Sequence, residues 1–267
     1  MAAELTIAGT LYLDLLKRVL TNTVFNEEPD ASEGSTIRYV EAAITHYQQS
    51  VALSMIPLVR FDNLQSCILD VVRQGVPGDL VETGIWRGGA TIFMRAVLKV
   101  LGVTDRVVWA ADSFEGLPEP DAEKYPLEAK SFKSAAMSSK YYNRLAVGLQ
   151  AVEQNFRVFG MLDGQVKFLK GWFCDTLPTA PIEKIAVLRL DGDYYESTMD
   201  ALINLYHKVS PGGYVIIDDY GEDGWTYCRK AVEEFRKERG IVDPLIEVDR
   251  PCSYWRKSGN EIGGSVT

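Results

Sequence analysis

The feature that most constrains this chain is a regular alternation of short β-rich runs with helical stretches, starting at about residue 78. Five apolar runs predict strands, at Asp79 to Thr83, Arg106 to Asp112, Gln165 to Lys170, Lys184 to Asp191 and Gly213 to Asp219. Between them, residues 87–102, 142–160, 197–209 and 226–240 carry apolar side chains at helical spacing. This alternation is typical of an α/β fold, a parallel sheet with helices on both faces.

Two later runs, Leu245 to Val248 and Ser253 to Arg256, would complete the sheet, the latter as an antiparallel edge. Residues 1–77 predict helices instead, at 11–25, 37–56 and 60–75. We expect this N-terminal helical layer to cap an active site or to make a dimer contact. The polar stretch 113–140, which has three prolines, predicts a lid. The main domain would then span 78–257, with a mobile tail at 258–267.

Charge and hydropathy exclude two classes of partner. The chain has 37 acidic and 28 basic residues, a net charge of -9, so no basic surplus is available for a nucleic acid. It lacks the run of roughly 20 apolar residues that spans a bilayer, and Glu4 and Asp14 stand where a signal peptide would be basic. We expect a cytoplasmic protein without membrane or nucleic-acid partners. The four widely spaced cysteines predict buried free thiols.

The end of the first predicted strand indicates a nucleotide site, because open parallel sheets bind ligands beyond the carboxyl ends of their strands. The strand leads into the next helix through Glu82, Thr83, Gly84, Gly88 and Gly89. This spacing matches neither the dinucleotide-binding nor the P-loop motif. It suits S-adenosylmethionine, whose carboxylate can bind the free N–H groups of a helix start. Asp112, after the second strand, is placed to bind ribose hydroxyls. A tight turn and a helix cap would also explain these residues.

Four aspartates follow the fourth and fifth predicted strands. Asp191 ends the fourth strand, Asp218 and Asp219 end the fifth, and Asp193 lies close by. Consecutive strands commonly neighbour one another, so these carboxylates converge on one rim and repel each other unless a cation lies between them. Oxygen ligands without His or Cys favour a hard ion, and we predict Mg²⁺. The alternative is that each aspartate caps a helix or ends a strand.

A bound Mg²⁺ would favour the ionised form of a sugar hydroxyl or a phenol. Asp193 is the predicted general base because it lies two residues beyond Asp191, where it could face the acceptor oxygen. The metal-bound oxyanion would then attack the methyl group in line, so positioning and electrostatics should supply much of the rate. Tyr194, Tyr195 and Tyr220 could line the acceptor pocket, although packing explains them equally well.

Five segments together resemble the macrocin O-methyltransferase (TylF-like) family: VPGDLVETGIWRGGA, ADSFEGLP, VKFLKGWFCDTLP, VLRLDGDYYESTMDAL and VSPGGYVIIDDY. The similarity runs from about Met55 to Arg256. That family methylates deoxysugar hydroxyls on macrolide and aminocoumarin antibiotics. The resemblance implies a Rossmann-like class I methyltransferase fold of seven strands, mostly parallel with an antiparallel C-terminal strand. It also implies S-adenosylmethionine and Mg²⁺ as cofactors and, usually, a homodimer.

The resemblance also implies roles for individual residues. Metal ligands would be Asp191, Asp218 and Asp219, with Asp193 as general base. The methionine and ribose parts of the cofactor would be surrounded by Glu82, Thr83, Gly84, Arg87, Gly88, Asp112 and Ser113. Gly171, Trp172 and Asp175 would lie near adenine, and Met55 and Ile56 would close over the cofactor. Plain core packing would also account for Trp172. The chain departs from the family at residues 23–50 and in GEDGWTYCRKAV, which leaves the identity of the sugar open.

We therefore predict an S-adenosylmethionine- and Mg²⁺-dependent O-methyltransferase of antibiotic biosynthesis. Its substrate would be a glycosylated small molecule with a free hydroxyl on a deoxysugar. Two alternatives remain at this point. One is a catechol or other phenol O-methyltransferase acting on an aromatic diol with the same metal geometry. The other is a nucleotide-binding protein without catalytic activity.

Overall fold

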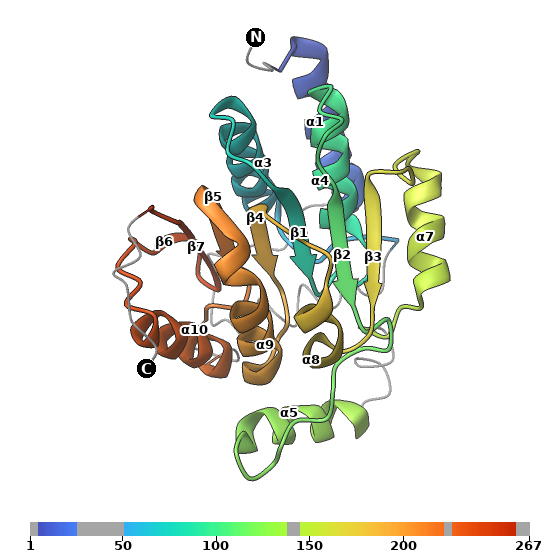
Figure 1. Ribbon diagram of the computed structural model, residues 1–267. Coiled ribbons are helices and arrows are strands. Elements are labelled where there is room, and N and C mark those ends of the chain that lie inside the picture. The colour runs from blue at the N-terminus through green and yellow to red at the C-terminus, as the bar shows by residue number, and fades with distance from the viewer. Residues whose placement is uncertain (1–4, 26–50, 138–144, 222–225, 260–267) are drawn as a thin grey trace.

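The computed structural model describes residues 5–25, 51–137, 145–221 and 226–259, and within this part the chain forms a seven-stranded sheet (Figure 1). The strand order is β3-β2-β1-β4-β5-β7-β6. The strands are β1 (Asp79–Thr83), β2 (Val108–Asp112), β3 (Val166–Lys170), β4 (Ile185–Leu190), β5 (Val209–Ile217), β6 (Ile246–Asp249) and β7 (Cys252–Arg256). β1 to β5 are parallel, β7 is antiparallel to β5, and β6 is antiparallel to β7. This topology confirms the predicted fold class.

Helices cover both faces of the sheet. One core contains side chains from α1 (Ile7–Leu20), α3 (Leu58–Arg73), α4 (Gly89–Val100) and α7 (Leu149–Val158). The other contains side chains from α9 (Tyr195–Leu205) and α10 (Thr226–Glu238). Because successive side chains of a strand point to opposite faces, β1 contributes Leu80 to the first core and Val81 to the second. Strands buried on both faces are apolar throughout, which is why they were visible in the sequence.

The N-terminal helices belong to the first of these cores. Leu13, Leu16 and Leu20 of α1 are buried in it, and Phe61 of α3 packs edge-on against Phe93 of α4 with 5.1 Å between ring centroids. Thr6 caps α1, since its hydroxyl accepts a hydrogen bond from the Gly9 N–H at 3.0 Å. The helical layer is therefore part of the main core. A role for residues 1–77 in capping the site or in dimer contact stays a prediction.

Several predicted helices differ from those observed. The predicted helix 11–25 begins earlier, at Ile7, and ends at Leu20. In the predicted helix 37–56, residues 37–50 lie outside the described residues and 51–56 are not helical; Pro57 disfavours helical backbone in the residue before it. The predicted helix 142–160 is shorter, because α7 begins only after Gly148. The predicted helix 197–209 ends at Leu205 and gives way to a 3₁₀ turn and then to β5.

The predicted lid contains a helix that was not expected. α5 (Pro126–Met137) lies beyond the carboxyl ends of the strands, at the bottom of Figure 1. The buried Glu128 carboxylate accepts a hydrogen bond from the Tyr195 N–H at 2.8 Å, and the Tyr125 ring stacks on the Tyr195 ring. The lid therefore docks on the start of α9. A second unexpected helix, α8 (Phe173–Thr176), follows β3.

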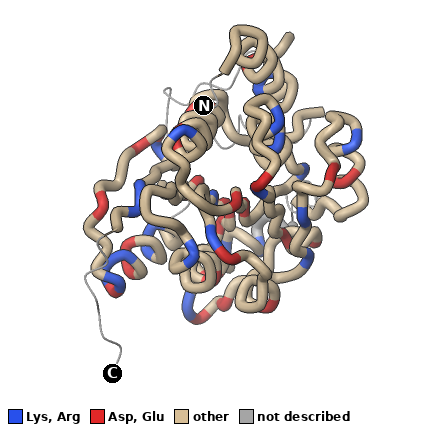
Figure 2. The backbone as a smooth tube through the Cα atoms, turned by 45° about the horizontal axis from the view of Figure 1, so that its top comes forward, with Lys and Arg blue, Asp and Glu red and all other residues tan. Residues whose placement is uncertain are grey.

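The distribution of charge agrees with the sequence analysis. Figure 2 shows basic positions interspersed among acidic ones along the described backbone. Among the described residues, every helix is too short or too polar to cross a membrane. All four cysteines are free, as predicted, but Cys174 is exposed, because it lies on the short surface helix α8.

Candidate functional site

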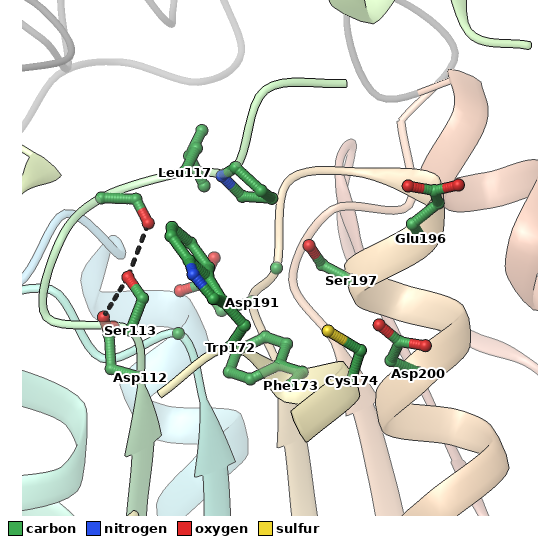
Figure 3. Close-up of a pocket in the computed structure, with 14 residues that line it drawn as sticks. Asp112, Ser113, Leu117, Trp172, Phe173, Cys174, Asp191, Glu196, Ser197 and Asp200 are labelled. Carbon is green, nitrogen blue, oxygen red and sulfur yellow. Dashed lines mark hydrogen bonds between the residues drawn. The ribbon is translucent and has the colours of Figure 1, made fainter. Parts of the chain in front are cut away.

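A cavity of about 280 Å³ opens at the carboxyl ends of β1, β2 and β4 (Figure 3). Its walls include the predicted residues Gly84, Asp112, Ser113, Trp172 and Asp191. A smaller cavity beside it is lined by Met55 and Asp193 among others, and shares Gly84, Asp112 and Asp191 with the first. These two cavities therefore bring together predicted cofactor residues, one predicted metal ligand and the predicted general base.

Sequence analysis missed a further part of the cavity wall. Leu117 of the lid lies on one side, and Phe173 and Cys174 of α8 lie on another (Figure 3). These side chains make much of the wall apolar, as expected for a site that holds a flat organic group. Their positions depend on an unpredicted helix and on the lid, so no local signal in the sequence pointed to them.

The turn after β1 is in direct contact with the turn after β4. Gly84 has φ +82°, and a Cβ added to it would overlap the carbonyl oxygen of Asp191. The Asp191 N–H donates to the carbonyl oxygen of Thr83 at 2.9 Å. Only glycine fits this contact, which fixes the predicted cofactor turn against the predicted metal turn.

Asp112 joins the turns that follow β1 and β2. Its carboxylate accepts hydrogen bonds from the Ile85 N–H at 2.8 Å and the Phe114 N–H at 2.7 Å. Ser113 donates to the carbonyl oxygen of Gly116 at 2.7 Å (Figure 3). Burial raises the pKa of Asp112, and the hydrogen bonds from backbone N–H groups oppose that rise. The wall of the cavity is therefore organised by the residue predicted to bind ribose, although the ribose contact itself stays a prediction.

Thr83 and Glu82 lie deeper, beneath the turn. The Thr83 hydroxyl is buried and has no hydrogen-bond partner among the described residues. An orphaned polar atom beside the cavity is a feature that a bound polar ligand would satisfy. The Glu82 carboxylate instead accepts from Arg189 at 2.5 Å and from the hydroxyl of Thr91. Contact of Glu82 with a cofactor stays a prediction.

The remaining predicted cofactor residues surround these cavities without lining either one: Ile56, Arg87, Gly88, Gly171 and Asp175. The Arg87 guanidinium lies over the Trp86 ring and donates to the carbonyl oxygen of Ala52 at 2.7 Å. It thereby fixes the segment that carries Met55. The Gly171 N–H donates to the carbonyl oxygen of Asp112 at 2.9 Å, which connects β3 to the cavity wall.

Asp191, Asp218 and Asp219 converge as predicted. Each offers a carboxylate oxygen, and these oxygens lie within 4.8 Å of one another. Burial raises the pKa of Asp191 and of Asp219, and neighbouring carboxylates raise both further. Three such oxygens suit a hard divalent cation in number, charge and donor type. The described residues therefore fit the predicted magnesium site.

Two buried arginines beside these aspartates were missed by sequence analysis. Arg189, in β4, donates from Nη1 to Asp191 at 2.9 Å and from Nη2 to Asp218. Arg60, in α3, donates to Asp218 at 2.7 Å. A signal for Arg189 was present, since an arginine inside the apolar run of β4 needs buried acidic partners. Arg60 has no comparable signal in its helix.

Asp193 occupies a strained turn between β4 and α9. Its φ is +61°, a conformation that costs a residue other than glycine about 1 kcal/mol or more. Its N–H donates to a carboxylate oxygen of Asp219 at 3.0 Å. The turn therefore holds the predicted general base beside the predicted metal ligands and on the wall of the smaller cavity.

The three predicted acceptor tyrosines have other partners in this structure. Tyr194 is buried, and the hydroxyls of Tyr195 and Tyr220 donate to Glu234 and Glu233 of α10, at 2.5 and 3.2 Å. These contacts fix α10 against the loops after β4 and β5. Contact of the tyrosines with an acceptor stays a prediction.

Comparison with known proteins gives consistent matches along the chain. The family model described as Macrocin-O-methyltransferase (TylF) matches residues 43–257. The 8-demethyl-8-(2,3-dimethoxy-alpha-L-rhamnosyl)-tetracenomycin-C 4'-O-methyltransferase of Streptomyces olivaceus is 49% identical over 255 residues, which is 93% of each chain. The mycinamicin III 3''-O-methyltransferase of Micromonospora griseorubida is 46% identical and covers 93% of this chain and 96% of its own.

A solved structure, that of the O-methyltransferase NovP, is similar throughout. Its TM-score is 0.80 at 45% identity, over 94% of this chain and 99% of that one. The similarity therefore includes the sheet, the helices on both faces and the loops that form the cavities.

Proposed function

This chain belongs to the macrocin O-methyltransferase (TylF) family and is an O-methyltransferase, and from that premise we propose that it methylates a deoxysugar hydroxyl on a natural product, with Mg²⁺ in the active site. Membership of the family implies S-adenosylmethionine as the methyl donor. The observation that carries the proposal is the convergence of Asp191, Asp218 and Asp219 within 4.8 Å, beside a cavity that Asp193 adjoins.

The donor side of the site would be the larger cavity. We propose that the methionine part of the cofactor lies against the turn at Gly84, where the orphaned Thr83 hydroxyl can donate to it. Asp112 would accept hydrogen bonds from the ribose, and Trp172 would contact adenine. These placements follow the family resemblance and agree with the cavity walls, and they aim the sulfonium methyl group toward the aspartates.

On the acceptor side, Asp191, Asp218 and Asp219 would hold Mg²⁺. When bound, the ion supplies positive charge that favours the ionised form of an acceptor hydroxyl. Asp193 would accept the hydroxyl proton at its carboxylate, and its strained turn keeps that carboxylate beside the ligands. The methyl group then passes in line to the acceptor oxygen, so the main task of the protein is to position donor and acceptor and to exclude water.

The relatives support a glycosylated acceptor. The name of the Streptomyces olivaceus enzyme specifies a dimethoxy-rhamnosyl group, and that enzyme is 49% identical to this chain. We propose that the lid bearing α5 closes over such a sugar, because its helix lies at the carboxyl ends of the strands and docks beside Asp193 through Tyr195.

The test is a parallel assay with labelled S-adenosylmethionine. Rhamnosylated polyketides and catechols are offered at equal concentrations, with Mg²⁺, with EDTA, and with Mg²⁺ restored after EDTA. We expect methylation of glycosides, loss with EDTA and recovery with Mg²⁺. Turnover of catechols alone would favour the phenol alternative, full activity in metal-free buffer would remove the ion from the mechanism, and cofactor binding without any turnover would refute the proposal.

We also propose that the enzyme is a cytoplasmic homodimer, as the family resemblance implies. Ile7, Leu11 and Leu15 lie four residues apart on α1 and are exposed, at 83%, 66% and 55% of their side-chain surface. Such a stripe would be covered by a second copy. Light scattering after size-exclusion chromatography should give twice the mass of 29.8 kDa, and Leu11→Glu should give the monomer mass.

A further inference from the structure

A chain of buried charges passes behind the acidic cluster and ends outside the sheet. It begins at Glu82 in β1, which binds Arg189 of β4. Arg189 binds Asp218, Asp218 binds Arg60 of α3, and Arg60 donates from Nε to Asp249 of β6 at 2.7 Å. All the side chains of this chain are at most 10% exposed. The N-terminal helical layer is therefore connected electrostatically to the loop after β5.

The three aspartates of the cluster are not equivalent in this chain. Asp218 has a guanidinium at each carboxylate oxygen, Arg189 at Oδ1 and Arg60 at Oδ2. Asp191 shares Arg189 through Oδ2, and Asp219 accepts the Asp193 N–H instead. Two positive charges thus lie against one of the three carboxylates.

Such an arrangement has two physical consequences. The guanidinium groups offset the mutual repulsion of the carboxylates, so the cluster stays assembled without an ion. They also reduce the attraction between Asp218 and any further cation, because the interaction of like charges is strong where little water screens it. An assembled site with partly compensated charge binds a divalent ion more weakly than three bare carboxylates would.

We propose that Arg60 is a positioning residue for the cation site: by holding Asp218 and offsetting its charge, it keeps the site assembled when empty and lowers its affinity for Mg²⁺. The proposal rests on the divalent cation of the proposed function. Arg60 is better suited to a test than Arg189, because it reaches Asp218 from α3, whereas Arg189 also binds Glu82 under the cofactor turn.

The test compares Arg60→Met with Arg60→Lys, which keeps the charge, and with Asp249→Asn, which removes the other carboxylate partner of Arg60. Calorimetric titration with MgCl₂ at pH 8 gives the Kd of the EDTA-treated protein. Melting temperatures are measured without the ion and with saturating Mg²⁺. Arg60→Gln keeps a donor for Asp218 while it removes the charge, and it is used if Arg60→Met does not fold.

We expect Arg60→Met to bind Mg²⁺ about tenfold more tightly than the wild type. Its melting temperature should fall without the ion and recover largely with it. Arg60→Lys and Asp249→Asn should keep the Kd within about twofold of the wild-type value. A merely structural arginine would lower the melting temperature equally with and without Mg²⁺ and leave the Kd unchanged, and that result would overturn the inference.

Failure of the proposed function would look different. If the wild-type protein gave no Mg²⁺ binding and EDTA left its activity intact, the cation site itself would be absent, and both proposals would fall. If the wild type bound Mg²⁺ and Arg60→Met bound it equally well or more weakly, only the role of Arg60 would fall.

Discussion

Replacing Arg189 by methionine tests how much stability the charge chain supplies. The Arg189 side chain is 2% exposed and contacts Glu82, Asp191 and Asp218. Methionine would fill much of the volume but would leave these carboxylates without their shared cation. Removing one partner of a buried ion pair typically costs 3–5 kcal/mol, because the charge left behind is neither paired nor hydrated.

We therefore expect Arg189→Met to lower the free energy of unfolding by about 3–5 kcal/mol. For a chain of this size that loss corresponds to a fall of roughly 6–20 °C in melting temperature. Urea titration in metal-free buffer at pH 7, followed by circular dichroism, measures the free energy directly. Melting curves of the same samples provide a second estimate.

Arg95→Met is the matched control. Arg95 is similarly buried in α4, but its partner Asp163 has a side chain that is 35% exposed, so water can hydrate the carboxylate left behind. We expect that variant to lose about 1 kcal/mol. Equal losses in the two variants, or a loss below about 1 kcal/mol for Arg189→Met, would refute the view that uncompensated buried acid dominates the cost.

Three further predictions follow from the site. Asp193→Asn should keep the affinity for S-adenosylmethionine and lose about 10² to 10⁴-fold in kcat, as expected for a general base, and unchanged turnover would assign the proton to another group. Burial raises the pKa of Glu128 to about 7, with Glu196 and Asp193 adding to the rise, so its protonated form favours the docked lid. The stability that Glu128 gives to docking is thus present at low pH and lost as pH rises through 7; hydrogen exchange of α5, corrected for intrinsic rates, should show greater protection at pH 6 than at pH 8, and Glu128→Gln should remove the difference. Gly84→Ala should destabilise the protein more than Gly75→Ala, because both have positive φ but only at Gly84 does the new Cβ meet the Asp191 carbonyl, and equal melting temperatures would contradict that reading.

The central sheet was predictable because burial on both faces makes its strands apolar throughout. The antiparallel β7 and the order of the strands follow from the same pattern together with the short connections between elements. α5 was not predictable, because the charged and polar residues of the lid give it only a weak apolar periodicity. The end of the predicted helix 37–56 was wrong because one proline outweighed an apolar pattern that suited a helix.

The aspartate cluster was predictable for a different reason. Carboxyl ends of neighbouring parallel strands meet at one edge, so Asp191, Asp218 and Asp219 had to approach each other once β4 and β5 were adjacent. Arg60 was not predictable, because it meets Asp218 across 158 positions of sequence, and no local pattern encodes such a contact. Side-chain partners of this kind depend on how helices pack, which the spacing of residues does not specify.

The contact between Gly84 and Asp191 has a consequence for redesign of this enzyme. The backbone of the methyl-donor side and that of the ion-binding side touch without an intervening side chain, so neither can be remodelled independently of the other. The lid approaches from the opposite side and docks through one carboxylate and stacked tyrosine rings. Libraries that seek new acceptors are therefore best directed at Tyr125 and the exposed positions of α5, where sequence changes leave the chemistry beneath them undisturbed.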